Sequence, residues 1–185
     1  DLLANVRALV NTESPQATRV LDSLIGYLRA ATPRLRDTAT TLGQELQLTR
    51  AYLELMQLRM PDRLQYAFEV DPAALPMRCP PMTVLTLVEN AVRHGIDPSE
   101  DGGRIDINVK LRGTRCEVRV TDTGLGLGAA NPGLGTGLTT LRERLNTAFG
   151  GRAQVRLGER PGRGFSAELD LPAEPAEAAP ARPQK

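Results

Sequence analysis

Aromatic residues are scarce in this chain of 185 residues, which has three Tyr, three Phe and no Trp. Proteins that bind nucleic acid commonly stack bases on aromatic rings and gather positive charge on one face. Here 23 basic residues are interspersed with 22 acidic ones, and the net charge is +1. Since both features are lacking, we expect no nucleic-acid partner.

Cysteine, histidine and long apolar runs are also in short supply. Cys79 and Cys116 have no paired spacing, and His94 is the only histidine, so neither a zinc site nor a disulfide framework is indicated. No apolar run approaches the roughly 20 residues of a membrane span. We therefore expect no membrane contact by these residues. Because the first residue, Asp1, lies inside a helical pattern, we expect the chain to be a fragment.

What the sequence does contain is enough aliphatic side chain for a core, with 41% hydrophobic residues. Two apolar stripes at helical spacing before Pro33 predict a helical hairpin. A third stripe predicts a helix from Thr41 to Pro61, with Gln44 completing a capping box. We assign residues 1–60 to this helical region, which we interpret as a truncated dimerisation hairpin and a connecting helix.

After Pro61 the pattern changes to strands that alternate with helices. The predicted elements are a strand at 64–70, a helix at 82–94, a hairpin at 105–111 and 116–120, a helix at 136–149, and strands at 153–157 and 165–171. This order predicts an α+β fold, a two-layer α/β sandwich whose mixed sheet is covered by helices on one face. We place this domain at residues 61–171, and we expect a disordered tail at 172–185, which is rich in Pro, Ala and Glu.

The first candidate for a binding site is the run Asp122-Thr-Gly-Leu-Gly-Leu-Gly128, which follows a predicted strand. A carboxylate accepts hydrogen bonds only, so Asp122 suits the exocyclic amine of adenine and disfavours guanine. Gly124 and Gly126 would let the backbone pass close to the ring. The alternative is a hairpin turn rich in Asp and Gly, and for this segment alone that alternative is favoured.

The second candidate is Gly133-Leu-Gly-Thr-Gly-Leu138, which leads directly into a predicted helix. Free N–H groups at a helix N-terminus attract anions, so phosphates would bind here. The predicted contacts are Gly133, Gly135, Thr136, Gly137 and Leu138. The alternative is a flexible loop before a helix. The segment fits neither the P-loop nor the dinucleotide fingerprint.

The third candidate is the helix that ends Glu89-Asn90-Ala-Val-Arg93-His94-Gly95. Asn90 offers a neutral oxygen ligand for Mg²⁺, and at helical spacing Arg93 and His94 share its face and meet phosphate charge. Glu89 has two possible roles, either a salt bridge to Arg93 or polarisation of a nucleophile at the γ-phosphate. The alternative for the whole segment is a core helix with a solvated polar face.

In this order the three segments resemble the N, G1 and G2 boxes of the Bergerat-fold ATPases. Leu87-Val-Glu-Asn-Ala-Val-Arg-His-Gly95, Leu138-Thr-Thr-Leu-Arg-Glu-Arg-Leu145 and Arg50-Ala-Tyr-Leu-Glu-Leu-Met-Gln-Leu-Arg-Met60 are similar to segments of sensor histidine kinases of the LytS/YehU type. The resemblance implies ATP and Mg²⁺ as ligands, autophosphorylation on a His, and transfer to an Asp of a response regulator. It also implies a homodimer formed through the N-terminal helices, and a cytoplasmic location, free or as part of a membrane-bound sensor.

Two positions depart from that family. The phosphoacceptor His expected in the first helix is not there, so we expect it upstream of this fragment or absent from the protein. Thr86 stands where many members have an acidic or amide residue, which leaves the identity of the catalytic base open. Two other functions therefore stay open, an ATP-binding switch or scaffold without kinase chemistry, and a stand-alone ATPase.

Overall fold

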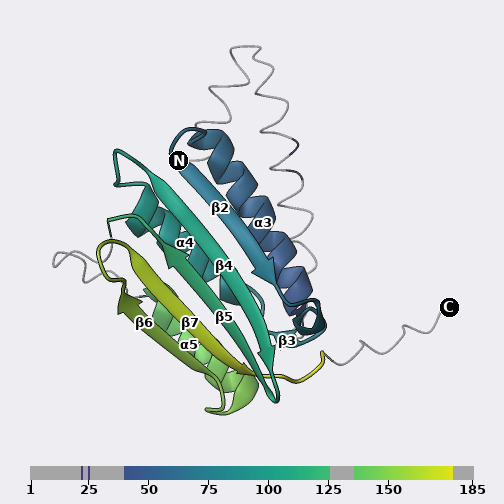
Figure 1. Cartoon of the computed structure of the whole chain (residues 1–185). Helices are drawn as coiled ribbons and strands as arrows, with labels where there is room; N and C mark the ends of the chain where they lie inside the picture. Colours follow the sequence, from purple (N-terminus) through teal and green to yellow (C-terminus); the bar gives the residue numbers. More distant parts are fainter. Residues whose placement is uncertain (1–21, 23–24, 26–39, 126–135, 177–185) are drawn as a thin grey trace.

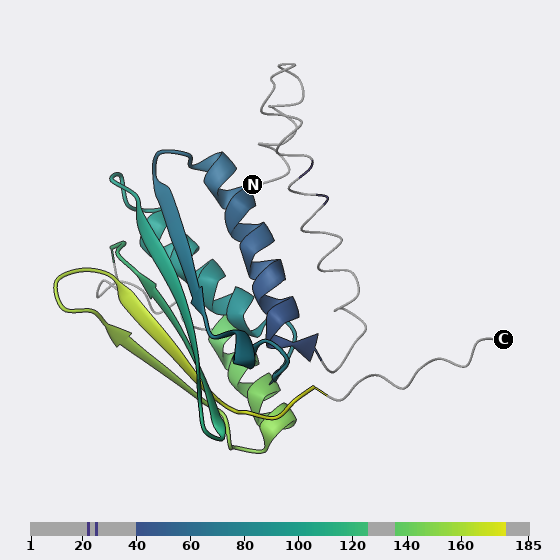
Figure 2. The ribbon, with the colours of Figure 1, turned by 45° about the vertical axis from the view of Figure 1, so that its right-hand side comes forward.

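The computed structural model describes residues 22, 25, 40–125 and 136–176. The ranges 40–125 and 136–176 form two layers (Figures 1 and 2). One layer is a five-stranded sheet, in which β2 is parallel to β4 and every other neighbouring pair is antiparallel. The α+β fold with a mixed sheet is therefore confirmed. In spatial order the strands are β2 (Leu64–Val70), β4 (Gly103–Arg112), β5 (Arg115–Asp122), β7 (Phe165–Pro172) and β6 (Gln154–Glu159).

The other layer holds the helices on one face of the sheet, as Figure 2 shows. Helix α3 (Leu42–Arg59) starts at the predicted capping box, in which Thr41 and Gln44 hydrogen-bond reciprocally. Although we assigned α3 to the leading helical region, its Leu42, Leu53 and Met56 belong to the same core as the sheet. The predicted hairpin before Pro33 lies outside the described residues, apart from two positions.

The helix predicted at 82–94 is present but changes its winding. Helix α4 (Thr83–Asn90) runs directly into a π-helix, η3 (Ala91–Ile96), in which the N–H of Asp97 donates to the carbonyl of Val92 at 2.8 Å. We call α4 and η3 together the nucleotide helix, residues 83–96. A π turn holds more residues than an α turn, and such turns are frequent at functional sites.

Helix α5 (Thr136–Phe149) has the predicted bounds. It ends at Gly150, whose φ of 57° is in the left-handed region and whose N–H donates to the carbonyl of Asn146 at 2.7 Å. Because glycine adopts this conformation at little cost, the Gly150–Gly151 pair stops the helix.

Three short elements have no counterpart in the sequence prediction. They are a pair of two-residue strands, β1 (Thr40–Thr41) and β3 (Arg78–Cys79), and a 3₁₀ turn, η2 (Pro72–Ala74). Strands of two residues show no periodicity, so a pattern search passes over them.

The C-terminal segment is structured beyond the predicted boundary at 171. Strand β7 includes Pro172, and Pro175 bridges Met77. The N–H of Arg78 donates to the carbonyl of Glu174 at 2.6 Å. Residues 172–176 therefore hold backbone hydrogen bonds that their composition did not predict, while residues 177–185 lie outside the described part.

The core lies between the two layers and is aliphatic. Alternate residues of β4 and β5, such as Ile105, Ile107, Val118 and Val120, are buried against the helices. The opposite face carries charged pairs such as Arg119–Glu168 at 2.9 Å. Asp122 continues the buried register of Val118 and Val120, so its side chain turns toward the helices.

Candidate functional site

One cavity lies between the nucleotide helix, the inner face of the sheet and the start of α5. Its volume is small, about 20 Å³, and it opens to solvent at its mouth. Most of its wall is apolar, and a few polar groups face into it. This composition is typical of sites for small ligands. The lining residues are Leu87, Asn90, Ala91, His94, Gly95, Val120, Asp122, Leu138, Leu157, Phe165 and Ala167.

Asp122 is the buried carboxylate of this cavity, with 2% of its surface exposed. Burial raises its pKa above the usual value, while hydrogen bonds from the backbone N–H groups of Gly124 and Phe165 and the charge of Arg160 oppose that shift. The Gly124 N–H donates to Oδ1 at 2.9 Å. Since both donors are backbone groups, the carboxylate is fixed in direction and retains acceptor capacity for a ligand.

Two glycines allow the nucleotide helix to approach Asp122 closely. A Cβ on Gly95 would lie 2.6 Å from Oδ1 of Asp122, and one on Gly124 would lie 2.1 Å from the carbonyl oxygen of Gly95. That oxygen also accepts a hydrogen bond from the N–H of Leu125 at 3.1 Å. Any side chain larger than hydrogen at either glycine would separate the helix from the strand end. The glycine requirement at 124 is therefore steric, whatever its role toward a ligand.

The π turn determines which residues of the nucleotide helix reach the cavity. Asn90 and His94 both line it, whereas Arg93 is exposed and does not. Our prediction placed all three on one face with α-helical spacing. In the wider π turn, position i+4 lies nearly above position i and position i+3 is rotated away, which accounts for the difference.

Two neighbouring ionisable groups on this helix have shifted pKa values. Burial, and secondarily the charge of Arg93, lowers the pKa of His94, so its imidazole is neutral at pH 7. Burial raises the pKa of the Glu89 carboxyl, although the residue as a whole is exposed. Among the described residues no ion pair joins Glu89 to Arg93, so the structure offers no support for the salt-bridge reading of Glu89.

The start of α5 forms the remaining wall. Leu138 is buried in the cavity lining, and Gly137 faces Thr86 of α4, where a Cβ would lie 3.7 Å from Cγ2. Thr136 is the first residue of α5. The predicted contacts Gly126, Gly133 and Gly135 lie outside the described residues.

Sequence reasoning missed much of the apolar lining, notably Leu157, Phe165 and Ala167. The sequence pattern placed these residues in strands at 153–157 and 165–171, but not in a binding site. It did not show that β7 lies next to β5, with Val120 opposite Ala167. Strand order is a long-range property, so these residues could not be assigned to the site from their local pattern.

The cavity has few side chains that could hold a metal ion. Within the described ranges there is no cluster of three or more His, Cys, Asp or Glu side chains that would hold an ion. A single neutral oxygen, such as that of Asn90, suits Mg²⁺ only when phosphate oxygens and water complete the shell. The site thus fits a metal that arrives with a phosphate-bearing ligand.

Comparisons with known proteins place this geometry in a family. A family model described as "Histidine kinase" matches residues 1–64, and one described as "Histidine kinase-, DNA gyrase B-, and HSP90-like ATPase" matches residues 82–175. The chain therefore belongs to the histidine kinase-, DNA gyrase B- and HSP90-like ATPase family. This membership identifies the domain as an ATP-binding one.

The curated relatives include sensor proteins, in line with the resemblance of the sequence to sensor histidine kinases. The Sensor protein LytS of Enterococcus faecalis is 27% identical over 184 residues, which cover 93% of this chain and 31% of that protein. The chain thus spans less than a third of the length of this curated relative. None of the helices in the described part of the chain combines the length and the apolar composition of a membrane span.

Solved structures of histidine kinases share the fold. The catalytic domain of histidine kinase ThkA matches with a TM-score of 0.57 and 18% identity, covering 75% of this chain and 97% of that one. Full-length ShkA, crystallised in complex with AMPPNP, matches with a TM-score of 0.55 and 22% identity, covering 89% of this chain and 37% of that one. At these identities the similarity establishes the fold alone.

Proposed function

We propose that this chain is the ATP-binding catalytic region of a two-component sensor histidine kinase. It would bind ATP with Mg²⁺ and donate the γ-phosphoryl group to a histidine, from which a response-regulator aspartate would receive it. The observation that carries this proposal is the buried carboxylate of Asp122 in an otherwise apolar cavity, closed by the tight Gly95–Gly124 contact. The family membership and the LytS relative support the kinase class.

We assign the adenine end of the site to Asp122. Its free acceptor capacity would take the exocyclic amine, and Gly124 would hold the carboxylate in direction. Phe165 and Leu157 would cover the ring with apolar surface. A guanine would place an oxygen against the carboxylate, so we expect it to be rejected.

We assign the phosphate end to the other wall of the cavity. Asn90 would ligate Mg²⁺, which would neutralise phosphate charge and orient the γ-phosphoryl group. The free N–H groups of Thr136, Gly137 and Leu138 at the start of α5 would hold phosphate oxygens, together with Gly126, Gly133 and Gly135 of the preceding segment. His94 would hydrogen-bond as a neutral imidazole, and Arg93 would meet the phosphates from the rim.

In the transfer step, the bond between the γ-phosphorus and the bridging oxygen of ADP breaks as a nitrogen–phosphorus bond forms on the acceptor imidazole. Glu89 would orient that imidazole and accept its proton, a role that suits a carboxyl with a raised pKa. His94 is the only histidine in the sequence and lines the ATP cavity, so it is badly placed as the acceptor. We propose that the acceptor lies on a longer polypeptide that includes these residues and dimerises through its N-terminal helices.

Radiolabelled [γ-³²P]ATP tests this function. The 185-residue chain should remain unlabelled, and the longer polypeptide should take up label that is stable to base and labile to acid, as phosphohistidine is. The Asp122→Asn variant of that polypeptide should take up none. Tight ATP binding without any transfer would favour a switch or scaffold instead, and steady phosphate release by the 185-residue chain would favour a stand-alone ATPase.

A further inference from the structure

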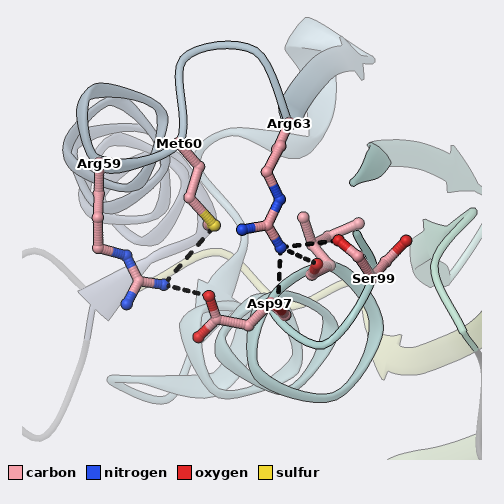
Figure 3. A network of polar contacts seen from close by, with 6 residues as sticks. Arg59, Met60, Arg63, Asp97 and Ser99 are labelled. Carbon is pink, nitrogen blue, oxygen red and sulfur yellow. Dashed lines mark hydrogen bonds and ion pairs between the residues drawn. The ribbon is translucent and has the colours of Figure 1, made fainter. Parts of the chain in front are cut away.

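Both ends of the nucleotide helix are held by side chains from α3 and the turn that follows it. At the start, the Glu45 carboxylate accepts hydrogen bonds from the N–H groups of Met82 at 3.1 Å and Leu85 at 3.2 Å. At the C-terminal end, Arg63 Nη2 donates to three backbone carbonyls (Figure 3). They belong to Ile96, Asp97 and Ser99 and lie at 3.3, 2.8 and 2.7 Å. Arg59 adds an ion pair with Asp97 at 2.8 Å.

These contacts cap the two ends of the nucleotide helix, where backbone groups lack partners within the helix. The first N–H groups and last carbonyls of a helix have no partners within it, and the start carries partial positive charge and the end partial negative charge. Met82, at the N-cap, has a φ of 62° and forms no side-chain cap. The fully buried Glu45 serves there instead, while the guanidinium of Arg63 meets the carbonyls at the opposite end.

The end held by Arg63 is also the wall that faces Asp122. Gly95 stands one residue before Ile96, and a Cβ on Gly95 would already lie 2.6 Å from Oδ1 of Asp122. The Gly95 carbonyl also accepts the N–H of Leu125. A small displacement of the helix end would therefore open or close the space beside the carboxylate.

We infer that Arg63 and Glu45 are positioning residues of the nucleotide site, which fix the helix that carries Asn90, His94 and Gly95. Neither residue lines the cavity, and both act through the helix ends. Both lie in the part matched by the histidine kinase model, 1–64, whereas every lining residue lies in the part matched by the ATPase model. The ATPase part therefore depends on the preceding part for the geometry of its site. This inference rests on the proposed ATP binding.

The test is titration calorimetry of the 185-residue chain with Mg-ATP and Mg-GTP, at a temperature where circular dichroism shows each variant folded. Arg63→Gln should weaken ATP binding roughly tenfold and narrow the preference for ATP over GTP, because the wall beside Asp122 shifts. The ATP affinity of Arg63→Lys should lie between those of the wild type and Arg63→Gln, because an ammonium keeps the charge but reaches fewer carbonyls. Glu45→Gln keeps one of the two acceptors and should weaken binding by a smaller factor.

Arg50→Gln is the matched control. Arg50 is also on α3, but its guanidinium lies over the Phe68 ring of β2, 4.1 Å from the ring centre. Its loss should lower the unfolding temperature slightly and leave the ATP dissociation constant within about twofold. Hydrogen exchange supplies a second measurement, in which the amides of residues 91–99 should exchange faster in Arg63→Gln and those of α5 should not.

The inference would be overturned if all three variants bound ATP within twofold of the wild type and only their unfolding temperatures were lowered. The three variants are Arg63→Gln, Arg63→Lys and Glu45→Gln. If Arg63→Gln does not fold, the ATP dissociation constants of Arg63→Lys and Glu45→Gln test the inference by the same criterion. A wild-type chain that fails to bind ATP would overturn the proposed function as well. Wild-type binding with unaffected variants rejects the positioning role alone.

Discussion

The carboxylate end of the cavity and the exposed surface of the nucleotide helix are built differently. At the Asp122 end, Gly95, Gly124 and the carboxylate touch so closely that a single methyl group would overlap neighbouring atoms. Outside the cavity lining, Glu89 and Arg93 are exposed on the surface of the nucleotide helix. Close backbone packing tolerates little change, whereas exposed charges act over longer distances and are screened by water and salt. The difference predicts a graded series of effects across one site.

The largest effect should come from Gly124→Ala. The new methyl group would lie 2.1 Å from the Gly95 carbonyl oxygen, so the strand end and the nucleotide helix must move apart. We expect ATP affinity to fall by at least about 100-fold and the unfolding temperature to drop, as measured by calorimetry and circular dichroism.

Gly158→Ala is the control for that change. Gly158 has an ordinary φ, and a Cβ there meets nothing within 4 Å. Its ATP affinity and stability should match the wild type. An unchanged affinity in Gly124→Ala would mean that the close approach of helix and strand does not shape the site.

The next largest effect should come from Asp122→Asn, which changes one acceptor into a donor without changing size. We expect a loss of about 2–3 kcal/mol in ATP binding, roughly 30- to 150-fold in the dissociation constant, and a lost preference over GTP. Because burial disfavours the charged carboxylate, the variant should unfold no more easily than the wild type at pH 7. A variant that unfolds more easily and binds ATP normally would contradict both expectations.

Acidification should weaken the binding of adenosine. This ligand is chosen because it has no phosphate that could interact with His94. The pKa of Asp122 is raised by burial, so the carboxyl takes up a proton at a higher pH than an exposed aspartate, and binding falls as pH decreases through that raised value. For stability the sign is opposite. The native state holds the proton more tightly than the unfolded chain, so this group's contribution declines as pH rises between the unfolded and native pKa values. Both slopes should be absent from Asp122→Asn.

A smaller effect is expected for Arg93→Gln. An exposed arginine at the rim should contribute a few-fold to ATP affinity, about 0.5–1 kcal/mol, and nothing to adenosine affinity. The contribution should shrink as salt increases. Arg112→Gln is the matched control, since Arg112 lies at the β4–β5 turn, at the opposite end of the hairpin from Asp122. Equal losses for ATP and adenosine would show that Arg93 acts on the fold and not on phosphate.

The smallest effect on binding should come from Glu89→Gln, which should leave ATP affinity within about twofold. Phosphoryl transfer by the longer polypeptide should slow by roughly 10²- to 10⁴-fold if the carboxylate accepts the proton. A normal transfer rate would remove Glu89 from the mechanism.

The sequence predicted those features of the structure that depend on residues close together in the chain. The strand at 64–70, the helix at 136–149 and the capping box of Thr41 were predicted correctly because each depends on neighbouring residues. Asp122 and Asn90 were identified by local motifs, and both line the cavity.

What the sequence could not predict depends on contacts between distant segments. The π turn that rotates Arg93 away from the cavity has no signal in the local pattern, and the position of Phe165 beside Asp122 depends on the pairing of β7 with β5. The short strand β3 is recognisable only once β1 is placed beside it. No periodicity encodes such pairings, so local patterns could identify the motifs but not the complete wall of the site.

Titration of the wild-type chain with ATP and with GTP, each with Mg²⁺, tests the central role of Asp122 most directly. We expect ATP to bind at least about tenfold more tightly than GTP and Asp122→Asn to abolish the difference. Equal affinities for the two nucleotides in the wild type would contradict it.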